Sequence, residues 1–456
     1  MPAIFLQDSE VFPMIWSSLF MGGLLATSQT PVLEKVPVAP TSVSVVQAPA
    51  KPADKPADAP KAEAKEEEEA PKFLLMRIAE GTHFGGFLDD HGIVVKGRMD
   101  GSFTASTAKS SNLPMAMNYL PNQFQLEQNT LIIDKAVDTK AAESTWGFRL
   151  ESILGGTDYR FSLSNNLAFN QLKQNDGGPN TYGVDPIQFY VEHYNPNFMN
   201  GLDTKVGRFY TILNSESLDP TQNKLVSRSL TFMNNPFTHT GVLTGTNLND
   251  KWVFYNGVTG GADVFFGPAA QAAYLGGLQG TLNDGKTVVN FNTQLTNPNF
   301  NQYLGTVNNY DVLEARLAHK INDKWDFLSC NMFSWIDNWD TNSSYPIFEK
   351  DGVTTRTFQG YANWFGFCNY LTYTFSEKAY TTSRVEFFVD SQGVRTGYTG
   401  LYTTLTQGLT YKMCEDQVWV RPEFRYDYAQ GRAYQDGSGN PTHGLFTFAL
   451  DFVVQY

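Results

Sequence analysis

One feature of this sequence constrains the fold more than any other. Apolar and polar side chains alternate strictly along many segments of about ten residues. In residues 417–428 one set of alternate positions is apolar and aromatic, and the other set is rich in charge. The charges are Arg421, Glu423, Arg425 and Asp427. Successive side chains of a strand point to opposite faces, so this segment predicts a β-strand with one apolar and one charged face.

The same alternation recurs in other parts of the chain. Segments 146–152, 312–320 and 384–390 each place charged residues opposite aliphatic and aromatic ones. Their charged residues include Arg149, Glu151, Glu314, Arg316, Arg384 and Glu386. Arg208, in the segment 202–213, is added to this set as a further charged strand residue. We therefore expect a protein built from many amphipathic strands.

Two environments can explain such strands. In a soluble sandwich the apolar face is the core, whereas in a membrane barrel it contacts lipid and the charged face lines a wet lumen. The apolar faces are rich in aromatic residues, as in membrane-interface girdles. The strands are about as long as a tilted membrane crossing requires. The chain ends inside an amphipathic strand, 445–456, with a terminal aromatic residue. The sequence predicts an all-β, transmembrane, up-and-down antiparallel barrel.

Turn composition divides the strands into hairpins. Short Asn/Asp/Gly turns recur, as at 248–252, 282–286 and 321–325, and longer loops rich in Gly, Asn, Pro and Ser lie between them. Strands are expected near 92–104, 123–134, 144–164, 184–195, 202–213, 236–248, 251–260, 270–282, 286–295, 309–321, 324–336, 358–375, 378–391, 398–412, 416–430 and 443–456. This amounts to about sixteen strands, with fourteen to eighteen as the accepted range. An even number places both termini on the periplasmic side of an outer membrane.

Composition excludes several function classes. The net charge is −13 and there is no basic face, so nucleic acid is not an expected partner. No apolar run after the N-terminal region is long enough for a membrane helix. The three cysteines have neither CxxC spacing nor paired histidines, which favours free thiols over a zinc site. A bridge between Cys330 and Cys368 stays open, because they fall on neighbouring expected strands.

The N-terminal region is expected to lie outside the barrel. Residues 1–28 contain a 12-residue apolar run, 15–26, followed by small residues, which predicts a secretory signal peptide; Met14 is an alternative start. Residues 29–72 form a Pro/Ala/Lys/Glu tract that predicts a disordered linker, either a tether to the cell wall or an inert spacer. Residues 73–91 are expected to form a short helical or irregular lead-in to a barrel spanning 92–456.

Several segments resemble a known family. They include Trp146-Gly-Phe-Arg-Leu-Glu, Val206-Gly-Arg-Phe-Tyr-Thr, Pro236-Phe-Thr-His-Thr-Gly, Arg384-Val-Glu-Phe-Phe-Val-Asp and Arg421-Pro-Glu-Phe-Arg-Tyr-Asp. In their order and spacing, over about residues 90–456, they resemble the β-barrel porin-2, or OmpL-like, family. The resemblance implies an outer-membrane porin and does not imply a particular solute.

Motifs that suggest other chemistry are outweighed by their context. Residues 280–287 match the phosphate-binding pattern GxxxxGK[ST], but a strand is expected after the lysine where that motif needs a helix. Segments 436–440 and 175–178 lack the spaced carboxylates of a calcium loop. The scattered histidines include His239, for which packing or a rim position is favoured. We therefore expect no catalytic residues, metal or cofactor.

The expected function is passive diffusion of small hydrophilic solutes through a water-filled channel, lined by the charged residues named above. Loop 214–235 is the candidate constriction, because it is long and carries both apolar and charged residues. Its charged residues are Glu216, Asp219, Lys224 and Arg228. An outward-facing adhesive loop is the competing interpretation. The expected partners are outer-membrane lipid and the solutes, and self-association into a homo-oligomer is left open. Two rival functions are a secreted soluble all-β binding protein and a wall-anchored structural barrel without flux.

Overall fold

The fold is described from a computed structural model of the 456-residue chain. The described residues are 25–26, 73–164, 167, 171, 180–267, 270–297, 310–340 and 347–456. The predicted signal peptide and linker, apart from the pair Leu25–Ala26, lie outside these residues, as does segment 175–178. Among the described residues, no helix is both long and apolar enough to cross a membrane.

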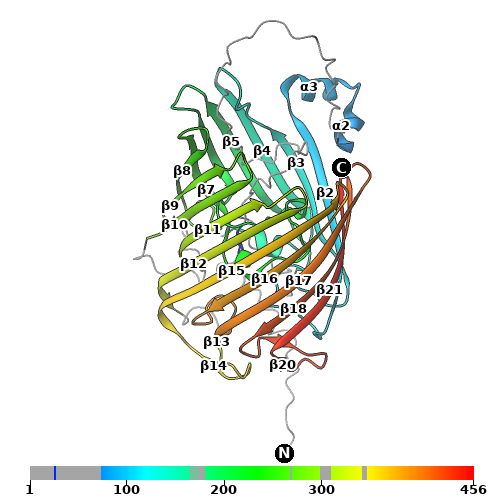
Figure 1. Cartoon of the computed structure of the whole chain (residues 1–456), viewed down its shortest axis with the longest axis vertical. Helices are drawn as coiled ribbons and strands as arrows, with labels where there is room; N and C mark the ends of the chain where they lie inside the picture. Colours follow the sequence, from blue (N-terminus) through cyan, green and yellow to red (C-terminus); the bar gives the residue numbers. More distant parts are fainter. Residues whose placement is uncertain are drawn as a thin grey trace, which may run out of the picture.

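Within the described residues, sixteen antiparallel strands form one closed barrel (Figure 1). They are β2 (Val94–Ser106), β3 (Phe124–Lys135), β4 (Thr145–Gly155), β5 (Asp185–Asn195), β6 (Leu202–Tyr210), β7 (Pro236–Asn247), β8 (Trp252–Thr259), β9 (Ala273–Leu282), β10 (Thr287–Leu295), β11 (Asp311–Lys320), β12 (Trp325–Asp340), β15 (Gln359–Ser376), β16 (Ala379–Asp390), β17 (Gly400–Met413), β18 (Val418–Ala429) and β21 (Gly444–Gln455). Each strand pairs with the next in sequence, and β21 pairs with β2 from Arg98↔Gln455 to Ser106↔Thr447. The predicted fold class and strand number are confirmed.

The connections differ at the two ends of the barrel. Four-residue turns such as 248–251, 283–286 and 321–324 lie at one end, where β2 begins and β21 ends. Longer connections, such as 107–123, 211–235 and 430–443, lie at the other end. We call these ends the short-turn rim and the long-loop rim. Antiparallel up-and-down topology produces this segregation, because every second connection lies at the same end.

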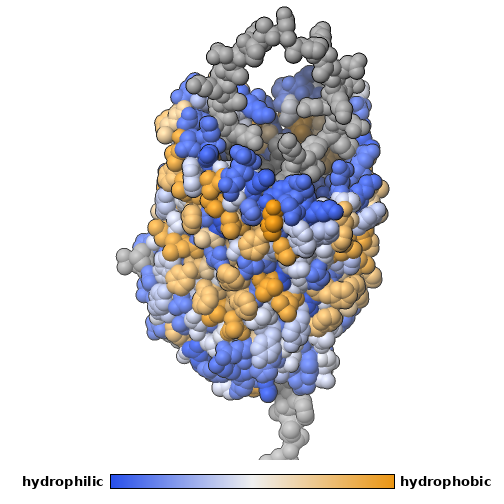
Figure 2. Space-filling view, in the orientation of Figure 1, coloured by the Kyte–Doolittle hydropathy of each residue, from blue (hydrophilic) through white to orange (hydrophobic). Residues whose placement is uncertain are grey.

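On the barrel strands the charged side chains are buried and the apolar side chains are exposed, which is the reverse of a soluble protein. In β18 the side chains of Arg421, Glu423 and Arg425 are each 1% exposed, whereas Phe424 and Tyr426 are 53% and 45% exposed. On the face drawn in Figure 2, apolar side chains gather in a band across the middle of the barrel, with hydrophilic side chains above and below, and exposed apolar residues occur on strands all around the barrel, such as Leu150, Val258, Phe333 and Phe446. An exposed apolar belt of this size is stable only against lipid, so the outer face is the membrane-facing one.

Smaller elements precede the barrel strands or lie in the long connections between them. Before the barrel, α2 (Leu74–Ala79) and α3 (His83–His91) lie at the short-turn rim, and the Met76 sulfur accepts a hydrogen bond from the N–H of Val95. In the long connections are α4 (Tyr159–Ser162), η2 (Pro220–Gln222), α5 (Leu230–Met233), β13 (Ile347–Phe348), β14 (Thr355–Arg356), β19 (Tyr434–Gln435) and β20 (Pro441–Thr442). The pair β1 (Leu25–Ala26) runs parallel to the start of β7.

One expected strand was too long. The segment 144–164 was predicted as a single strand, but β4 ends at Gly155. Two consecutive glycines, Gly155 and Gly156, weaken the strand, and the chain then turns into α4. The lumen-side residues after the break are therefore placed by a loop, which matters for Asp158 below.

The cysteines agree with the expectation of free thiols. Cys330 and Cys368 lie directly opposite each other on β12 and β15, both buried and both free, and Cys414 is free in a short turn. The Cys330 thiol contacts the Glu314 carboxylate at 3.4 Å.

Barrel closure generates a stability prediction. Gly97 of β2 lies under the ring of Tyr456, and a Cβ at this position would lie 2.3 Å from Tyr456 Cε2 and 2.7 Å from the Thr130 carbonyl oxygen. Gly97→Ala should therefore destabilise the barrel by about 1–3 kcal/mol through overpacking at the seam. Gly101→Ala is the matched control on the same strand, because its Cβ would meet only the Gln125 carbonyl oxygen at 3.6 Å.

The detergent-folded protein is heated and then run on a gel, on which the folded and unfolded barrels migrate differently. The measured quantity is the temperature at which the band of the folded form is replaced by that of the unfolded form. This temperature should fall for Gly97→Ala and stay at the wild-type value for Gly101→Ala. Equal temperatures for both variants would show that Tyr456 does not constrain the seam.

Candidate functional site

The lumen of the barrel contains the connection between β6 and β7. This segment, residues 211–235, is called the lumen loop from here on. Nearly all of its residues are buried, and its polar atoms bond to inward-facing side chains of strands on several sides of the barrel. A sixteen-stranded barrel is too wide for its own side chains to fill, and the lumen loop occupies part of the space that they leave.

Carboxylates of the barrel wall hold the backbone of the lumen loop. Glu423 accepts hydrogen bonds from the N–H groups of Val226 at 2.7 Å and Ser227 at 3.2 Å. Glu386 accepts bonds from the first N–H groups of α5, those of Leu230 at 3.0 Å and Thr231 at 2.6 Å. Glu386 thereby satisfies free N–H groups at a helix start. The bonds to both carboxylates are charge-assisted and therefore stronger than neutral ones.

Arginines of the barrel wall also hold the lumen loop, by donating hydrogen bonds to its carbonyl and carboxylate groups. Arg384 forms an ion pair with Glu216 at 2.8 Å and donates to the Ser227 carbonyl at 2.7 Å. Arg425 donates to the Arg228 carbonyl at 2.6 Å. Arg421 donates to the Pro220 carbonyl at 2.7 Å and also forms an ion pair with Asp451 of β21. Asp427 forms an ion pair with Arg425 at 2.7 Å. These charges therefore serve loop attachment, directly or through a neighbour.

The lumen loop also reaches the other walls. Its N–H of Asn214 donates to Glu314 of β11 at 2.8 Å. Its carbonyl of Ile212 accepts from Asn292 of β10 at 2.8 Å. Its Asp219 forms an ion pair with Arg98 of β2 at 3.0 Å. The loop is thus tethered across the lumen and is not laid against a single strand.

Two wall glycines make room for the loop. A Cβ on Gly366 of β15 would lie 2.2 Å from Thr231 Oγ1, and one on Gly408 of β17 would lie 2.6 Å from Leu225 Cδ2. Close approach of a second chain segment is one of the few reasons for glycine in the interior of a strand. The lumen loop and the wall are therefore packed in direct contact at both places.

A second group of predicted residues lies beside the loop, on β4 and β11. Arg149 pairs with Glu151 at 2.9 Å, and Glu151 also accepts from Arg98 at 2.6 Å. Arg316 pairs with Glu314 at 3.4 Å. All of these side chains point inward and are almost fully buried. Most wall charges are thus neutralised by a neighbour of opposite sign.

The remaining loop charges have local partners. Lys224 lies over the ring of Tyr380, 4.7 Å from its centroid. Arg228 donates to the Ser217 carbonyl at 2.9 Å and so ties the loop to itself. Burial lowers the pKa of the Arg228 guanidinium, and the negative charge of Glu216 opposes this shift. Burial without a carboxylate partner disfavours the charged form of any base.

Arg208 differs from the other predicted residues. It has the strand parity of Val206, whose side chain is exposed on the outer face, so alternation does not place it in the lumen. It is nevertheless buried, because it pairs with Asp185 at 3.0 Å and donates to the Ser162 carbonyl at 2.8 Å. The expectation that Arg208 lines the channel with the other charges does not match this position.

Some residues of the site were missed by sequence reasoning. Arg98 and Asp451 belong to the network, although the alternation of Lys96, Arg98 and Asp100 in β2 was visible in the sequence. Arg395 was also missed. Its guanidinium lies 5.0 Å from the Tyr310 ring centroid and 4.8 Å from that of Trp364, and it donates to Asn234 of the lumen loop. Loop residues such as Arg395 carry no strand periodicity that could have identified them.

The motifs that suggested other chemistry are accounted for by turns and packing. Residues 283–286 form the turn between β9 and β10, so a strand follows Lys286 where a phosphate-binding helix would have to begin. Asp436 Oδ1 accepts from the N–H groups of Ser438 and Asn440 and shapes a loop. The His239 ring lies buried between the Thr211 hydroxyl and the Gly261 carbonyl. Among the described residues, no group of His, Cys, Asp and Glu side chains is placed to hold a metal ion.

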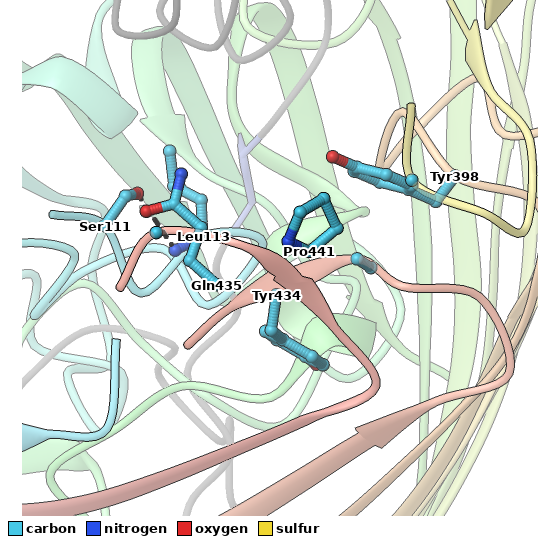
Figure 3. Close-up of a pocket in the computed structure, with 9 residues that line it drawn as sticks. Ser111, Leu113, Tyr398, Tyr434, Gln435 and Pro441 are labelled. Carbon is cyan, nitrogen blue, oxygen red and sulfur yellow. Dashed lines mark hydrogen bonds between the residues drawn. The ribbon is translucent and has the colours of Figure 1, made fainter. Parts of the chain in front are cut away.

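The long loops interlock at their rim and enclose a small pocket (Figure 3). Phe348 donates to the Gly397 carbonyl at 2.7 Å, and Ser110 donates to the Gln435 side chain at 2.8 Å. The pocket is lined by Ser111, Leu113, Gly352, Tyr398, Ala433, Tyr434, Gln435, Gly439 and Pro441. These lining residues are uncharged. The pocket is a space left between four loops that pack together over the lumen.

The attachment of the lumen loop generates a prediction. Arg384→Met leaves Glu216 without its ion-pair partner, and breaking a buried pair in this way costs about 3–5 kcal/mol. We expect a more mobile lumen loop and increased current noise through a single channel. Arg208→Met is the matched control, because it breaks a comparably buried pair with Asp185, and the hydrogen-bond partners of Arg208 all lie outside the lumen loop.

The double variant Arg384→Met/Glu216→Gln should show less current noise than Arg384→Met alone, because it leaves no unpaired carboxylate at position 216. Equal noise in Arg384→Met and Arg208→Met would exclude a special role of the Arg384 contact.

Comparisons with known proteins agree with this architecture. OmpF of Salmonella typhi, solved with daunomycin, matches with a TM-score of 0.51 at 11% identity, over 80% of this chain and 97% of that one. The anion-selective porin of Comamonas acidovorans matches with a TM-score of 0.50 at 9% identity, over 80% and 99%. At such low identity these likenesses show the fold alone. No curated protein sequence matches the chain.

The family comparison goes further than the fold. The model of the family described as "Putative beta-barrel porin-2, OmpL-like" matches residues 92–456, which is the whole barrel. The chain therefore belongs to this family, and it is an outer-membrane β-barrel porin.

Proposed function

We propose that the barrel is a general diffusion channel for small hydrophilic solutes and that the lumen loop forms its narrowest section. One observation carries this proposal: a 25-residue segment is fixed inside a lumen whose wall is charged. A polar, hydrated lumen passes solutes without a dedicated binding site, and an inserted loop sets the size limit.

The charge pattern supports weak selectivity. Wall arginines and carboxylates are paired with each other or with the lumen loop, as in Arg384–Glu216 and Arg425–Asp427. Paired charges present dipoles to a passing ion and little net field. The whole chain has a net charge of −13, and this excess of acids supports a weak preference of the proposed channel for cations.

The orientation in the membrane follows the rims. The first strand begins and the last strand ends at the short-turn rim. Single-chain barrels place their short turns and both termini in the periplasm. We assign the long-loop rim to the cell surface on this ground. A linker at 29–72 would then lie in the periplasm, where it could reach the cell wall.

Rival functions make different demands on the fold. A soluble all-β binding protein would need a polar outer face, and the exposed side chains of Phe424, Tyr426 and Phe446 argue against one. A structural barrel without flux differs from a channel only in conduction. Neither alternative requires catalysis, and we propose that the protein catalyses no reaction. Whether the protein forms a homo-oligomer is a separate question. The particle mass of the detergent-solubilised protein distinguishes a single chain from an assembly of several.

The proposal is tested by single-channel current across a planar bilayer under a salt gradient. The folded protein should give discrete, ohmic steps with a small cation-selective reversal potential. Insertion without current would support the structural barrel, and failure to insert would overturn the membrane assignment.

A deletion tests the lumen loop itself. Removal of residues 218–230 takes away the anchors to Arg421, Glu423 and Arg425 and should raise the single-channel conductance, because the narrowest section is widened. The control is deletion of 433–441 in the long-loop rim, which should leave the conductance close to the wild-type value. Unchanged conductance after deletion of 218–230 would remove the lumen loop from the conduction path.

A further inference from the structure

Three carboxyl groups lie close together in the lumen. Asp100 is on β2, Glu127 is on β3, and Asp158 precedes α4 in the connection after β4. Their residues are only 5%, 3% and 2% exposed. Asp100 lies opposite Gln128 in the strand register, and the N–H of Asp158 donates to the Glu127 carbonyl at 3.1 Å. The backbone thus brings all three acids to one place.

A bulge creates this arrangement. The pairing of β2 and β3 shifts between Asp100 and Gly101, so that Glu127 and Gln128 are both turned inward. A bulge inserts one extra residue and re-aims side chains, and bulges concentrate next to functional sites. Without it, strand alternation would bury only one of the two residues.

Hydroxyl and amide donors orient the central carboxyl group. Glu127 accepts from Ser102 Oγ and from Thr157 Oγ1, each at 2.5 Å, and from Asn118 Nδ2 at 2.9 Å. The Asp158 carboxyl group has Glu127 as a close negative neighbour. A proton held by either carboxyl group would remove the repulsion between them.

The positive charges around the cluster are too few to neutralise it. Within the described part of the chain, none of the three acids forms an ion pair. Facing them are the Arg421–Asp451 pair of β18 and β21, Arg228 of the lumen loop and the phenol of Tyr119. Arg421 is already taken by Asp451. Oxygen atoms Oδ1 of Asp100 and Asp158 have no hydrogen-bond partner.

Like charges buried together cannot all be ionised, so such a cluster retains a proton or a bound cation. No metal site is formed by the described residues. Burial, with Glu127 as a negative neighbour, raises the pKa of the Asp158 carboxyl well above its usual range. The protonated form is thereby favoured in the folded protein.

The cluster is connected to the lumen loop through one side chain. Gln128 Nε2 donates to Asp158 Oδ2 at 2.8 Å and to the Leu218 carbonyl at 2.7 Å. Asp100 and Glu127 are fixed on paired strands, whereas Asp158 lies in a connection. Repulsion between the three groups is therefore relieved most easily by movement of Asp158, which would carry the Gln128 contact with it.

We propose that Asp100, Glu127 and Asp158 form a proton-binding site that holds at least one proton at neutral pH, and that its ionisation loosens the lumen loop at Leu218. The proton is exchanged with lumen water, and no other bond is formed or broken. The second half of this proposal rests on the proposed function, since it assigns a pH response to the constriction.

The sign of the effect follows from the raised pKa of Asp158. Asp158 holds its proton more tightly in the folded, attached state, so the attachment is strongest at low pH and weakens as the pH rises through the raised pKa of Asp158. We expect a quiet channel in acid and larger current fluctuations in alkaline solution.

The first test is infrared difference spectroscopy of the detergent-folded barrel between about pH 5 and pH 9. The wild type should show the carbonyl stretch of a protonated carboxylic acid, which fades in alkali. Asp158→Asn and Glu127→Gln should each weaken this band, and Asp351→Asn, in an exposed loop, should not. A wild-type spectrum without the band near neutral pH, or a band unchanged in both cluster variants, would overturn the proton-binding site.

The second test records single-channel current over the same pH range. Fluctuations should rise with pH in the wild type and in Asp351→Asn, and Asp158→Asn should remove this dependence. Equal pH dependence in Asp158→Asn and the wild type would overturn the coupling to the lumen loop. The infrared result does not depend on conduction, so failure of the porin proposal and failure of the proton site are distinguishable.

Discussion

Closure of the sheet into a barrel determines how the other parts of this protein must be arranged. A strand edge exposed to hydrocarbon leaves backbone N–H and C=O groups without partners, and the pairing of β21 with β2 removes that edge. Closure also fixes which face of every strand is outside. Once apolar residues such as Phe424 and Tyr426 face lipid, Arg421 and Glu423 can only face inward.

The inward charges then need partners. A buried guanidinium or carboxylate is costly unless it is paired and hydrogen-bonded. The lumen loop supplies what the wall lacks: backbone N–H groups for Glu386 and Glu423, and carbonyls and carboxylates for Arg384 and Arg425. The wall and the loop are therefore complementary polar surfaces. A loop held by many charge-assisted bonds is positioned more sharply than one held by apolar contacts alone.

The need of buried charges for partners also distinguishes the three acids beside the loop, Asp100, Glu127 and Asp158. Arg421 is shared between Asp451 and the lumen loop, and it leaves Asp100 with no pair of its own. Glu127 is satisfied by hydroxyl and amide donors, which are neutral. This corner of the lumen thus differs from the paired remainder, and it is the corner that Gln128 links to Leu218.

Period-two alternation and turn composition were sufficient to predict the barrel and its strand number. They also predicted the strand face on which most of the charged residues lie. Side-chain direction in a strand is a local property, so Arg384 and Glu386 could be assigned to one face without any knowledge of their neighbours. The error at Arg208 came from its charge, which suggested the lumen although its parity with Val206 indicates the outer face. The early end of β4 was signalled by Gly155 and Gly156 but was overridden by the apolar pattern beyond them.

A closed barrel with an apolar outside and a charged inside can be predicted from the sequence alone, because both features follow from local periodicity. Which charges meet depends on the three-dimensional arrangement of the strands and loops. The pairing of Arg384 with Glu216, the fit of Thr231 against Gly366, and the convergence of Asp100, Glu127 and Asp158 join residues from separate strands and loops. Such contacts depend on strand register, on a bulge and on the path of a long loop through the lumen, and none of these leaves a periodic trace in the chain.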